Sequence, residues 1–320
     1  MIVSVLILLA GLALVVFGAD WLVDGASGIA RKAGISEFVI GLTIVGFGTS
    51  CPELVVSLTG AFQGNADISI GNVIGSNIFN TVLILGLTAL VSPVAITAGN
   101  RNRDIPIALL VTFLFVICGM NLSLLGVGET DAISRVEGIV FLVIFAIYLY
   151  VCFKYDTGSE EQDGSCAENV PLWKSAALSV LGIGGLIFGG TLFVNSATDI
   201  ARAVGVSDKF IAITLLAGGT SLPELVTCIV AAVKHKEQLA LGNILGSNVF
   251  NILLILGLSA IVTPLSFKSI SQVDVGILLL SAVLVWLWTY TGKKDRIDRM
   301  EGLIMLLCYS AYMVWLFLSV

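Results

Sequence analysis

The chain contains one stretch twice, and this duplication restricts its possible folds more than any other feature. Residues 17–93 align with residues 188–264 without a gap, because each pair is separated by 171 positions (188 − 17 = 171), and 34 of the 77 pairs are identical. Identity this high at one constant offset exceeds what two unrelated apolar segments would share. The sequence therefore predicts two copies of one structural unit.

The composition indicates that this unit lies in a membrane. Of the 320 residues, 57% are hydrophobic and 12% are charged, and the mean hydropathy is +1.04, whereas soluble domains are about 25% charged. A polytopic membrane protein embedded in the lipid bilayer is therefore expected. The formal net charge is −6 and no basic patch is present, which argues against a nucleic-acid partner.

Ten apolar stretches are long enough to cross the bilayer. They are predicted at residues 2–24, 37–62, 69–91, 104–122, 133–153, 172–199, 209–233, 239–262, 272–291 and 300–319. The first stretch follows Met1 without a preceding basic segment, so it is interpreted as a retained span rather than a cleaved signal.

Each half of the chain holds five of these spans, so the second half must enter the bilayer in the opposite orientation. The expected fold class is an all-α polytopic membrane protein with ten transmembrane helices in two inverted five-helix repeats. The expected units are 1–153, a linker at 154–171, and 172–320. The acidic linker is interpreted as a solvated cytoplasmic segment, because its spacing lacks the glycine and final glutamate of a calcium-binding EF-hand loop.

The distribution of positive charge predicts the orientation. With the N-terminus outside, the cytoplasmic loops hold 12 of the 16 Lys and Arg residues and the extracellular loops hold 4. Because cytoplasmic loops are enriched in Lys and Arg, both termini are expected to be extracellular, in a protein of the cell membrane.

Two polar motifs interrupt the apolar spans, and each occurs in both halves. The first, Gly-Thr-Ser-x-Pro-Glu, covers 48–53 and 219–224. Its acids, Glu53 and Glu224, fall near span centres, where a carboxylate costs about 2.5–3.5 kcal/mol on insertion scales. Both copies fit a Ser-x-x-Glu capping box with proline in the first turn, which predicts that a helix restarts at each glutamate.

A helix that restarts must first end, and this predicts a site. Unpaired backbone at membrane depth is tolerated only inside protein or beside a water-filled cavity. Carbonyl oxygens, hydroxyls and two carboxylates would then converge, which suits a hard cation such as calcium. Zinc or copper would require His or Cys ligands, and the one histidine, His235, lies in a predicted surface loop.

The second motif, Gly-Asn-x-x-Gly-Ser-Asn-x-Phe-Asn, covers 71–80 and 242–251. Its glycines are expected to allow close helix packing. Its last asparagines, Asn80 and Asn251, fall near span centres and are predicted site residues, whereas Asn77 and Asn248, one turn earlier, receive less weight. Inverted repeats would bring both motifs together around a pseudo-two-fold axis.

Four further acids lie within or beside predicted spans. Asp20 and Asp24 correspond to the uncharged Thr191 and Asn195, so we expect them at the membrane interface rather than in the site. Asp104 and Asp274 lie where spans begin and are interpreted as helix caps or water-facing residues.

The paired motifs resemble the two alpha-repeats of the cation/calcium exchanger superfamily, particularly its prokaryotic sodium/calcium exchanger branch, over essentially the whole chain. The resemblance implies transported Ca²⁺ and Na⁺ ions rather than a cofactor, with the first and sixth helices as the gating pair. By motif position it implies calcium ligands at Glu53, Glu224, Thr49 and Thr220. It also implies sodium-binding or central residues at Gly46, Ser50, Ser76, Asn80, Ala217, Ser221, Ser247 and Asn251.

One departure from the family leaves the driving ion open. Sodium/calcium members often have aspartate in one repeat where this chain has Asn80 and Asn251, so the site holds at most two carboxylate charges. The sequence before each glutamate favours sodium, because proton/calcium relatives usually show a different motif there. A Ca²⁺/Na⁺ antiporter, for which a monomer would suffice, is therefore the prediction; an H⁺/Ca²⁺ antiporter and a cation channel are the alternatives. An intramembrane enzyme is disfavoured, since no nucleophile and base occur together.

Overall fold

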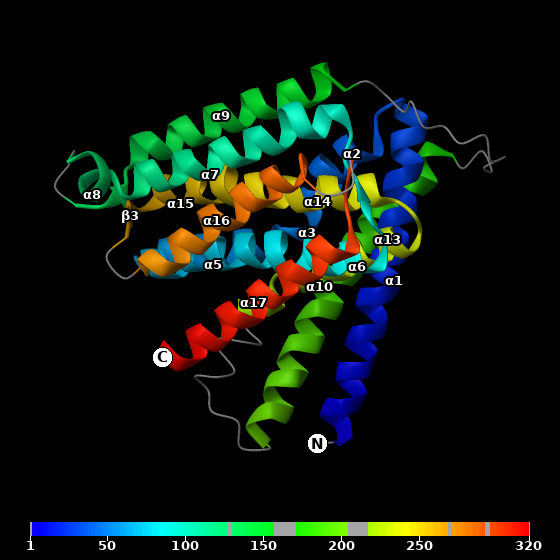
Figure 1. Ribbon diagram of the computed structural model, residues 1–320. Coiled ribbons are helices and arrows are strands. Elements are labelled where there is room, and N and C mark those ends of the chain that lie inside the picture. Colours follow the sequence, from blue (N-terminus) through cyan, green and yellow to red (C-terminus); the bar gives the residue numbers. More distant parts are fainter. Residues whose placement is uncertain are drawn as a thin grey trace.

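The computed structural model describes residues 2–126, 130–156, 171–203, 217–267, 270–291 and 295–319, and these are mostly helical (Figure 1). The elements of the first half are α1 (Ile2–Ala33), α2 (Glu37–Ile40), η1 (Gly41–Val45), α3 (Gly46–Thr49), α4 (Cys51–Phe62), α5 (Ala66–Ile78), η2 (Phe79–Ile84), α6 (Leu85–Val91), β1 (Val94–Ala95), η3 (Asn100–Asp104), α7 (Ile105–Gly119), α8 (Asn121–Leu125), β2 (Ala132–Ile133) and α9 (Arg135–Lys154).

The elements described in the second half are α10 (Leu172–Ala203), α12 (Ala217–Gly219), α13 (Leu222–Val233), α14 (Glu237–Val249), η5 (Phe250–Leu256), α15 (Gly257–Val262), β3 (Leu265–Ser266), α16 (Gln272–Trp288), β4 (Arg296–Ile297) and α17 (Arg299–Ser319). Their bounds repeat those of the first half at the sequence offset: α4 and α13 differ by 171 at both ends (222 − 51 and 233 − 62). The stretches 66–91 and 237–262 match in the same way.

The described chain is a multi-pass membrane protein. Within the described residues, 7 helices are long and apolar enough to cross a bilayer, and an eighth span results if Glu37–Thr49 and Cys51–Phe62, which meet at a bend of 49°, form one broken span. Helices α13 and α16 are apolar but shorter. Residues 209–216 of one predicted span and most of the predicted linker lie outside the described residues, so the count of ten stays a prediction.

Helices α1 and α10 lie side by side and antiparallel, and they cross the other helices steeply (Figure 1). Glycines let the two backbones touch: a Cβ added at Gly18 would lie 2.8 Å from the Leu186 amide nitrogen, and one at Gly11 would lie 2.8 Å from that of Phe193. Small residues permit this approach in membranes, where the hydrophobic effect does not drive helices together.

The packing role predicted for the second motif is confirmed for its copy in α14. A Cβ at Gly242 would lie 2.1 Å from the Phe38 carbonyl oxygen, and one at Gly246 would lie 2.2 Å from that of Leu42. For Gly71 and Gly75 no atom of the described residues lies within 4 Å of such a Cβ. Helix α14 is therefore clamped against the α2–η1 segment by backbone contact.

The described chain is mostly helical, as predicted, and it also contains two short antiparallel strand pairs that the sequence analysis did not predict. Strand β1 pairs with β4, and β2 pairs with β3. The chain reverses there between helices, and the paired strands bond backbone groups that would otherwise be left without partners. Strands β1 and β3 again lie 171 residues apart (265 − 94).

Three π-helical turns, which the sequence does not predict, interrupt the helices that carry the motifs. They are η1 before Gly46, η2 around Asn80 and η5 around Asn251. Turns of this kind bond i to i+5, and they occur frequently at functional sites. Each therefore adjoins a predicted site residue.

The acids outside the two motifs contact other parts of the protein than the motif residues. Asp20 and Asp24 both pair with Lys234, at 2.6 and 2.7 Å, which ties α1 to the end of α13. The prediction for Asp104 was wrong: its side chain is buried, makes no capping bond and binds the Arg103 guanidinium at 2.8 Å, because a buried carboxylate is stabilised by pairing with an opposite charge.

Asp274 lies in the first turn of α16, and its carboxylate accepts a hydrogen bond of 2.9 Å from the Tyr312 hydroxyl. The N-cap of that helix is Ser271, whose hydroxyl accepts from the amide of Val273. Asp274 is therefore not the capping residue, and its bond instead joins α16 to α17.

We expect Gly242→Ala to destabilise the folded protein, because its new methyl group would overlap the Phe38 carbonyl. Overpacking of this kind costs about 1–3 kcal/mol. Gly276→Ala in α16 is the matched control, since no described atom lies within 4 Å of a Cβ there. Thermal unfolding of the purified protein in detergent measures both, and equal midpoints for the two variants would contradict the clamp.

We also expect the Lys234 contacts to stabilise α1 in a pH-dependent manner. Burial lowers the pKa of Lys234, but hydrogen bonds to Asp20 and Asp24 outweigh burial and raise the pKa above its usual 10.5. Because the folded-state pKa is raised, the stabilisation from these contacts is complete below the unfolded-state pKa. It is lost as the pH rises from there through the folded-state pKa. The difference in unfolding midpoint between wild type and Lys234→Gln should therefore be constant from pH 6 to 9 and shrink above about pH 10.5; no difference at pH 7 would contradict it.

Candidate functional site

Two buried carboxylates mark the centre of the candidate site. Glu53 lies in the first turn of α4 and Glu224 in the first turn of α13, with side chains 0% and 1% exposed. Pro52 and Pro223 precede them and lack the amide that would bond a carbonyl four residues earlier. The chain therefore leaves helical geometry just before each acid, at Ser50 and Ser221.

The predicted capping boxes do not form; instead each serine binds the glutamate of the other half. The Ser50 hydroxyl donates to Glu224 Oε1 at 3.0 Å, and the Ser221 hydroxyl donates to Glu53 Oε1 at 2.8 Å. Neither helix has a side-chain cap. Hydrogen bonds to a carboxylate are roughly twice as strong as neutral ones. The serines therefore stabilise the buried acids instead of the helix ends, and they tie the two broken helices together.

Ser76 of α5 contacts both Glu53 and Ser221. Its hydroxyl lies 3.4 Å from Glu53 Oε1 and 3.2 Å from the Ser221 hydroxyl. Five of the predicted residues thus take part in two hydrogen-bonded groups that make up the centre of the site. One is Ser50 with Glu224, and the other is Glu53 with Ser76 and Ser221.

Other polar atoms of the predicted site are buried without a partner in the described part of the chain. They are Glu53 Oε2, Glu224 Oε2, Thr220 Oγ1, Ser247 Oγ, Asn80 Oδ1, Asn80 Nδ2 and Asn251 Oδ1. Each such atom costs about 1–3 kcal/mol when it is left unsatisfied. Six of these seven atoms are oxygens, so the site offers ligands that suit a cation.

The remaining predicted residues adjoin these groups or are not joined to them. The Thr49 hydroxyl donates to the Val45 carbonyl at 3.1 Å and lies 3.1 Å from Asn243 Oδ1. A Cβ at Gly46 would lie 3.3 Å from the Ser247 amide nitrogen, so η1 touches α14 there. Ala217 begins α12, which packs against α5. In the described residues no hydrogen bond joins the Asn80 side chain to Glu53 or Glu224.

Two residues that the sequence analysis did not select support the broken helices. Asn72 Nδ2 donates to the Ser57 hydroxyl at 2.9 Å and to the Glu53 carbonyl at 3.2 Å. Asn243 lies 171 residues later, and its Nδ2 is 3.2 Å from the Cys228 sulfur. Both belong to the Gly-Asn pair that opens the second motif, so their recurrence in the two copies was the signal that could have identified them.

The electrostatics of the site call for a cation. No ion pair between described residues includes Glu53 or Glu224, and the pairs that do occur involve Arg101, Arg103, Lys234, His235 and Lys236. The described residues also contain no group of three or more His, Cys, Asp or Glu side chains that could hold a metal. Two carboxylates with hydroxyl and amide oxygens suit hard cations rather than zinc or copper.

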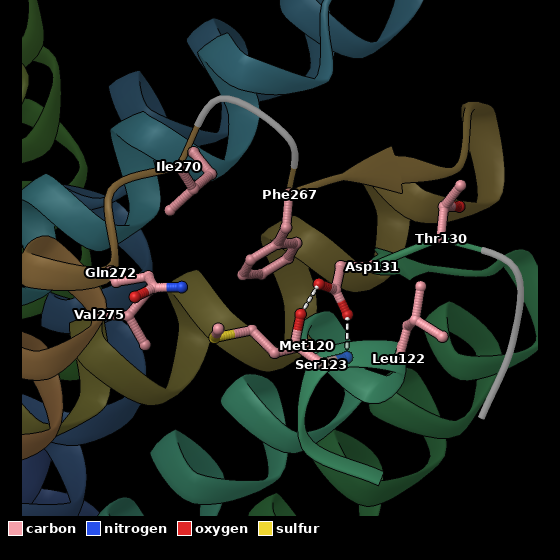
Figure 2. Close-up of a pocket in the computed structure, with 9 residues that line it drawn as sticks. All are labelled: Met120, Leu122, Ser123, Thr130, Asp131, Phe267, Ile270, Gln272 and Val275. Atoms are coloured by element: carbon pink, nitrogen blue, oxygen red, sulfur yellow. Dashed lines mark hydrogen bonds between the residues drawn. The ribbon is translucent and has the colours of Figure 1, made fainter. Parts of the chain in front are cut away.

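A separate pocket beside the β2–β3 pair lacks these properties (Figure 2). It is lined by Met120, Leu122, Ser123, Thr130, Asp131, Phe267, Ile270, Gln272 and Val275. Its one carboxylate, Asp131, already accepts hydrogen bonds from the hydroxyl and the amide of Ser123, which lower the pKa of Asp131. This acid is therefore satisfied by the protein itself, unlike Glu53 and Glu224.

We expect Ser50→Ala to weaken cation binding without unfolding the protein, because Glu224 loses its donor while α4 loses no cap. Hydrogen bonds to charged groups contribute about 1.5–3 kcal/mol, so cation affinity should fall roughly ten- to a hundredfold. Ser281→Ala, which removes a buried hydroxyl bonded to the Leu278 carbonyl, is the control. A lower unfolding midpoint with unchanged affinity would instead support the capping box.

Comparisons with known proteins agree with this chemistry. The family model described as "Sodium/calcium exchanger protein" matches residues 3–154 and 174–318. Putative antiporter CaxA of Alkalimonas amylolytica is 38% identical over 328 residues, covering 100% of both chains. Sodium/calcium exchanger MaX1 of Methanosarcina acetivorans is 36% identical over 354 residues, covering 98% of this chain and 99% of the relative.

Solved structures of the sodium-calcium exchanger NCX_Mj superpose on the chain with a TM-score of 0.85 at 34% identity, covering 98% of each chain. The family match extends over both halves, and the described helices are those of a multi-pass membrane protein. The chain therefore belongs to the sodium/calcium exchanger family of membrane cation antiporters.

Proposed function

We propose that the chain is a secondary active antiporter that exchanges Ca²⁺ for Na⁺ across the cell membrane by alternating access. The observation that carries this proposal is the crossed pair of serine–glutamate bonds, which leaves one oxygen of each buried carboxylate without a partner in the described chain. One Ca²⁺ between the two acids neutralises their charge, and Na⁺ ions compete for the same oxygens. Neither acid then stays buried as an uncompensated charge.

In this proposal calcium is held by Glu53, Glu224 and the backbone carbonyls of Thr49 and Thr220. Sodium uses the hydroxyl oxygens of the serines and the surrounding small residues, with two asparagines at the centre. These residues are Ser50, Ser76, Ser221, Ser247, Gly46, Ala217, Asn80 and Asn251. All the proposed ligands come from one chain, so a monomer contains the complete site.

The charge of the proposed site determines whether the transport cycle moves net charge across the membrane. With two carboxylates and neutral asparagines, the calcium-loaded site has no net charge and a site holding three sodium ions has a charge of +1. Moving one charge through the membrane field is worth about 2.3 kcal/mol per 100 mV. Exchange with that stoichiometry would use the membrane potential in addition to the sodium gradient.

The proposed organisation follows from the duplication. Residues 1–153 and 172–320 form two inverted repeats joined by a cytoplasmic linker at 154–171, with both termini extracellular. Helices α1 and α10 form a gating pair that moves against the remaining helices, and the glycine contacts between them are consistent with movement as one body.

We expect Glu53→Gln and Glu224→Gln each to abolish calcium flux in proteoliposomes, because either change removes half of the compensating charge. Glu137→Gln is the matched control, since Glu137 belongs to a capping box at the start of α9 in which glutamine can replace glutamate. Circular dichroism verifies folding, and full flux in both site variants would exclude the proposal.

The same vesicles identify the driving ion. Calcium uptake is measured under a sodium gradient alone and under a proton gradient alone, each with the membrane potential clamped. We expect uptake that saturates and requires sodium. Uptake driven by the proton gradient alone would establish the H⁺/Ca²⁺ alternative, and flux that needs no counter-ion would establish a channel.

A further inference from the structure

A chain of asparagine side chains crosses between the two copies of the second motif. Asn77, at the end of α5, donates through Nδ2 to the Asn248 backbone carbonyl at 3.2 Å. Its Oδ1 accepts from Asn251 Nδ2 at 2.9 Å. Asn77 and Asn251 are 1% and 0% exposed, so water does not replace either bond.

These bonds determine which way the Asn251 amide faces. A backbone carbonyl can only accept a hydrogen bond, so Asn77 must present Nδ2 to residue 248 and Oδ1 to Asn251. Asn251 must then present Nδ2 to Asn77. Its Oδ1 points away from Asn77 and has no partner in the described chain. Asn251 lies one turn after Ser247 on the same helix face, and its segment η5 packs against α4, the helix that carries Glu53.

The equivalent bond in the other half is not formed. At the offset of 171 it would run from Asn80 Nδ2 to Asn248 Oδ1, and both atoms are buried without a partner among the described residues. Asn248 instead donates through Nδ2 to the Thr81 hydroxyl at 2.8 Å. The counterpart of Thr81 is Ile252, which offers no acceptor. Thr81 therefore breaks the symmetry between the halves.

We propose that Asn77 is a positioning residue that holds Asn251 as a fixed, uncharged oxygen ligand for the transported cation, whereas Thr81 diverts Asn248 and leaves Asn80 free to rotate. This inference rests on the proposed function. The two central asparagines then have different roles despite their equivalent positions: Asn251 always offers oxygen to the ion, and Asn80 can offer either end of its amide.

A double-mutant cycle tests the inference on the purified full-length protein. Calcium affinity and its competition by sodium are measured for wild type, Asn77→Ala, Asn251→Ala and the double variant. Asn77→Ala should weaken calcium binding on the order of tenfold, or about 1.4 kcal/mol. If Asn77 acts through Asn251, it should have little further effect when Asn251 is already alanine. Multiplying losses in the double variant would overturn the inference.

The pseudo-symmetric pair supplies the control. Asn80→Ala and Asn248→Ala should combine without coupling, because no hydrogen bond joins them. In a Thr81→Val background Asn248 loses its acceptor, and coupling between residues 80 and 248 should appear. Coupling in wild type that equals the 77–251 value would overturn the asymmetry.

The outcomes separate this inference from the proposed function. If wild type binds no calcium and transports none, the proposed function fails whatever the cycle shows. If wild type binds calcium that sodium displaces, and the 77–251 coupling is absent, only the positioning role of Asn77 is excluded. Circular dichroism of each variant verifies folding. The conservative variant Asn77→Gln keeps the amide oxygen and the amide NH₂ group, so it should recover part of the affinity that Asn77→Ala loses. A purely steric role would not predict this recovery.

Discussion

The structure depends on how two carboxylates are kept inside a protein that is itself inside a membrane. Glu53 and Glu224 are fully buried, and no described cationic side chain pairs with either. Serine hydroxyls satisfy one oxygen of each acid, but a hydroxyl supplies no charge. Removing an ionised group from water costs several kcal/mol even after relaxation. Compensation must therefore come from outside the polypeptide, which is the property required of a site that has to release its ion.

The break in each helix and the bonding of each acid are parts of one arrangement. Proline removes an amide, the chain leaves helical geometry at the preceding serine, and that serine is then free to reach across to the other half. Because Ser50 binds Glu224 and Ser221 binds Glu53, a displacement of either broken helix changes the surroundings of both acids.

Much of this arrangement was predictable from the sequence, because the duplication identifies polar residues that recur at one offset. Glu53, Glu224 and Ser76 were selected in this way and lie together. The capping box was wrong for a physical reason: local spacing shows which bonds are possible within one helix, but not that a buried carboxylate from the other half competes for the same hydroxyl. The π-helical turns at η2 and η5 were not predicted, because the apolar periodicity of a span does not distinguish a π-helical turn from α-helix.

The residues at the carboxylates are the same in the two copies, whereas the residues that support them differ. The Gly-Thr-Ser-x-Pro-Glu residues and Asn72 with Asn243 are the same in both halves, and they include both acids and the two serines bonded to them. The partner of each supporting asparagine differs, since Asn72 binds Ser57 and Asn243 binds Cys228, yet both partners are small side chains able to hydrogen bond. Thr81 and Ile252 differ more, because only the first can accept a hydrogen bond. This difference determines that the Asn251 amide is held and the Asn80 amide is free. The two halves are therefore equivalent at the carboxylates but not at the asparagines.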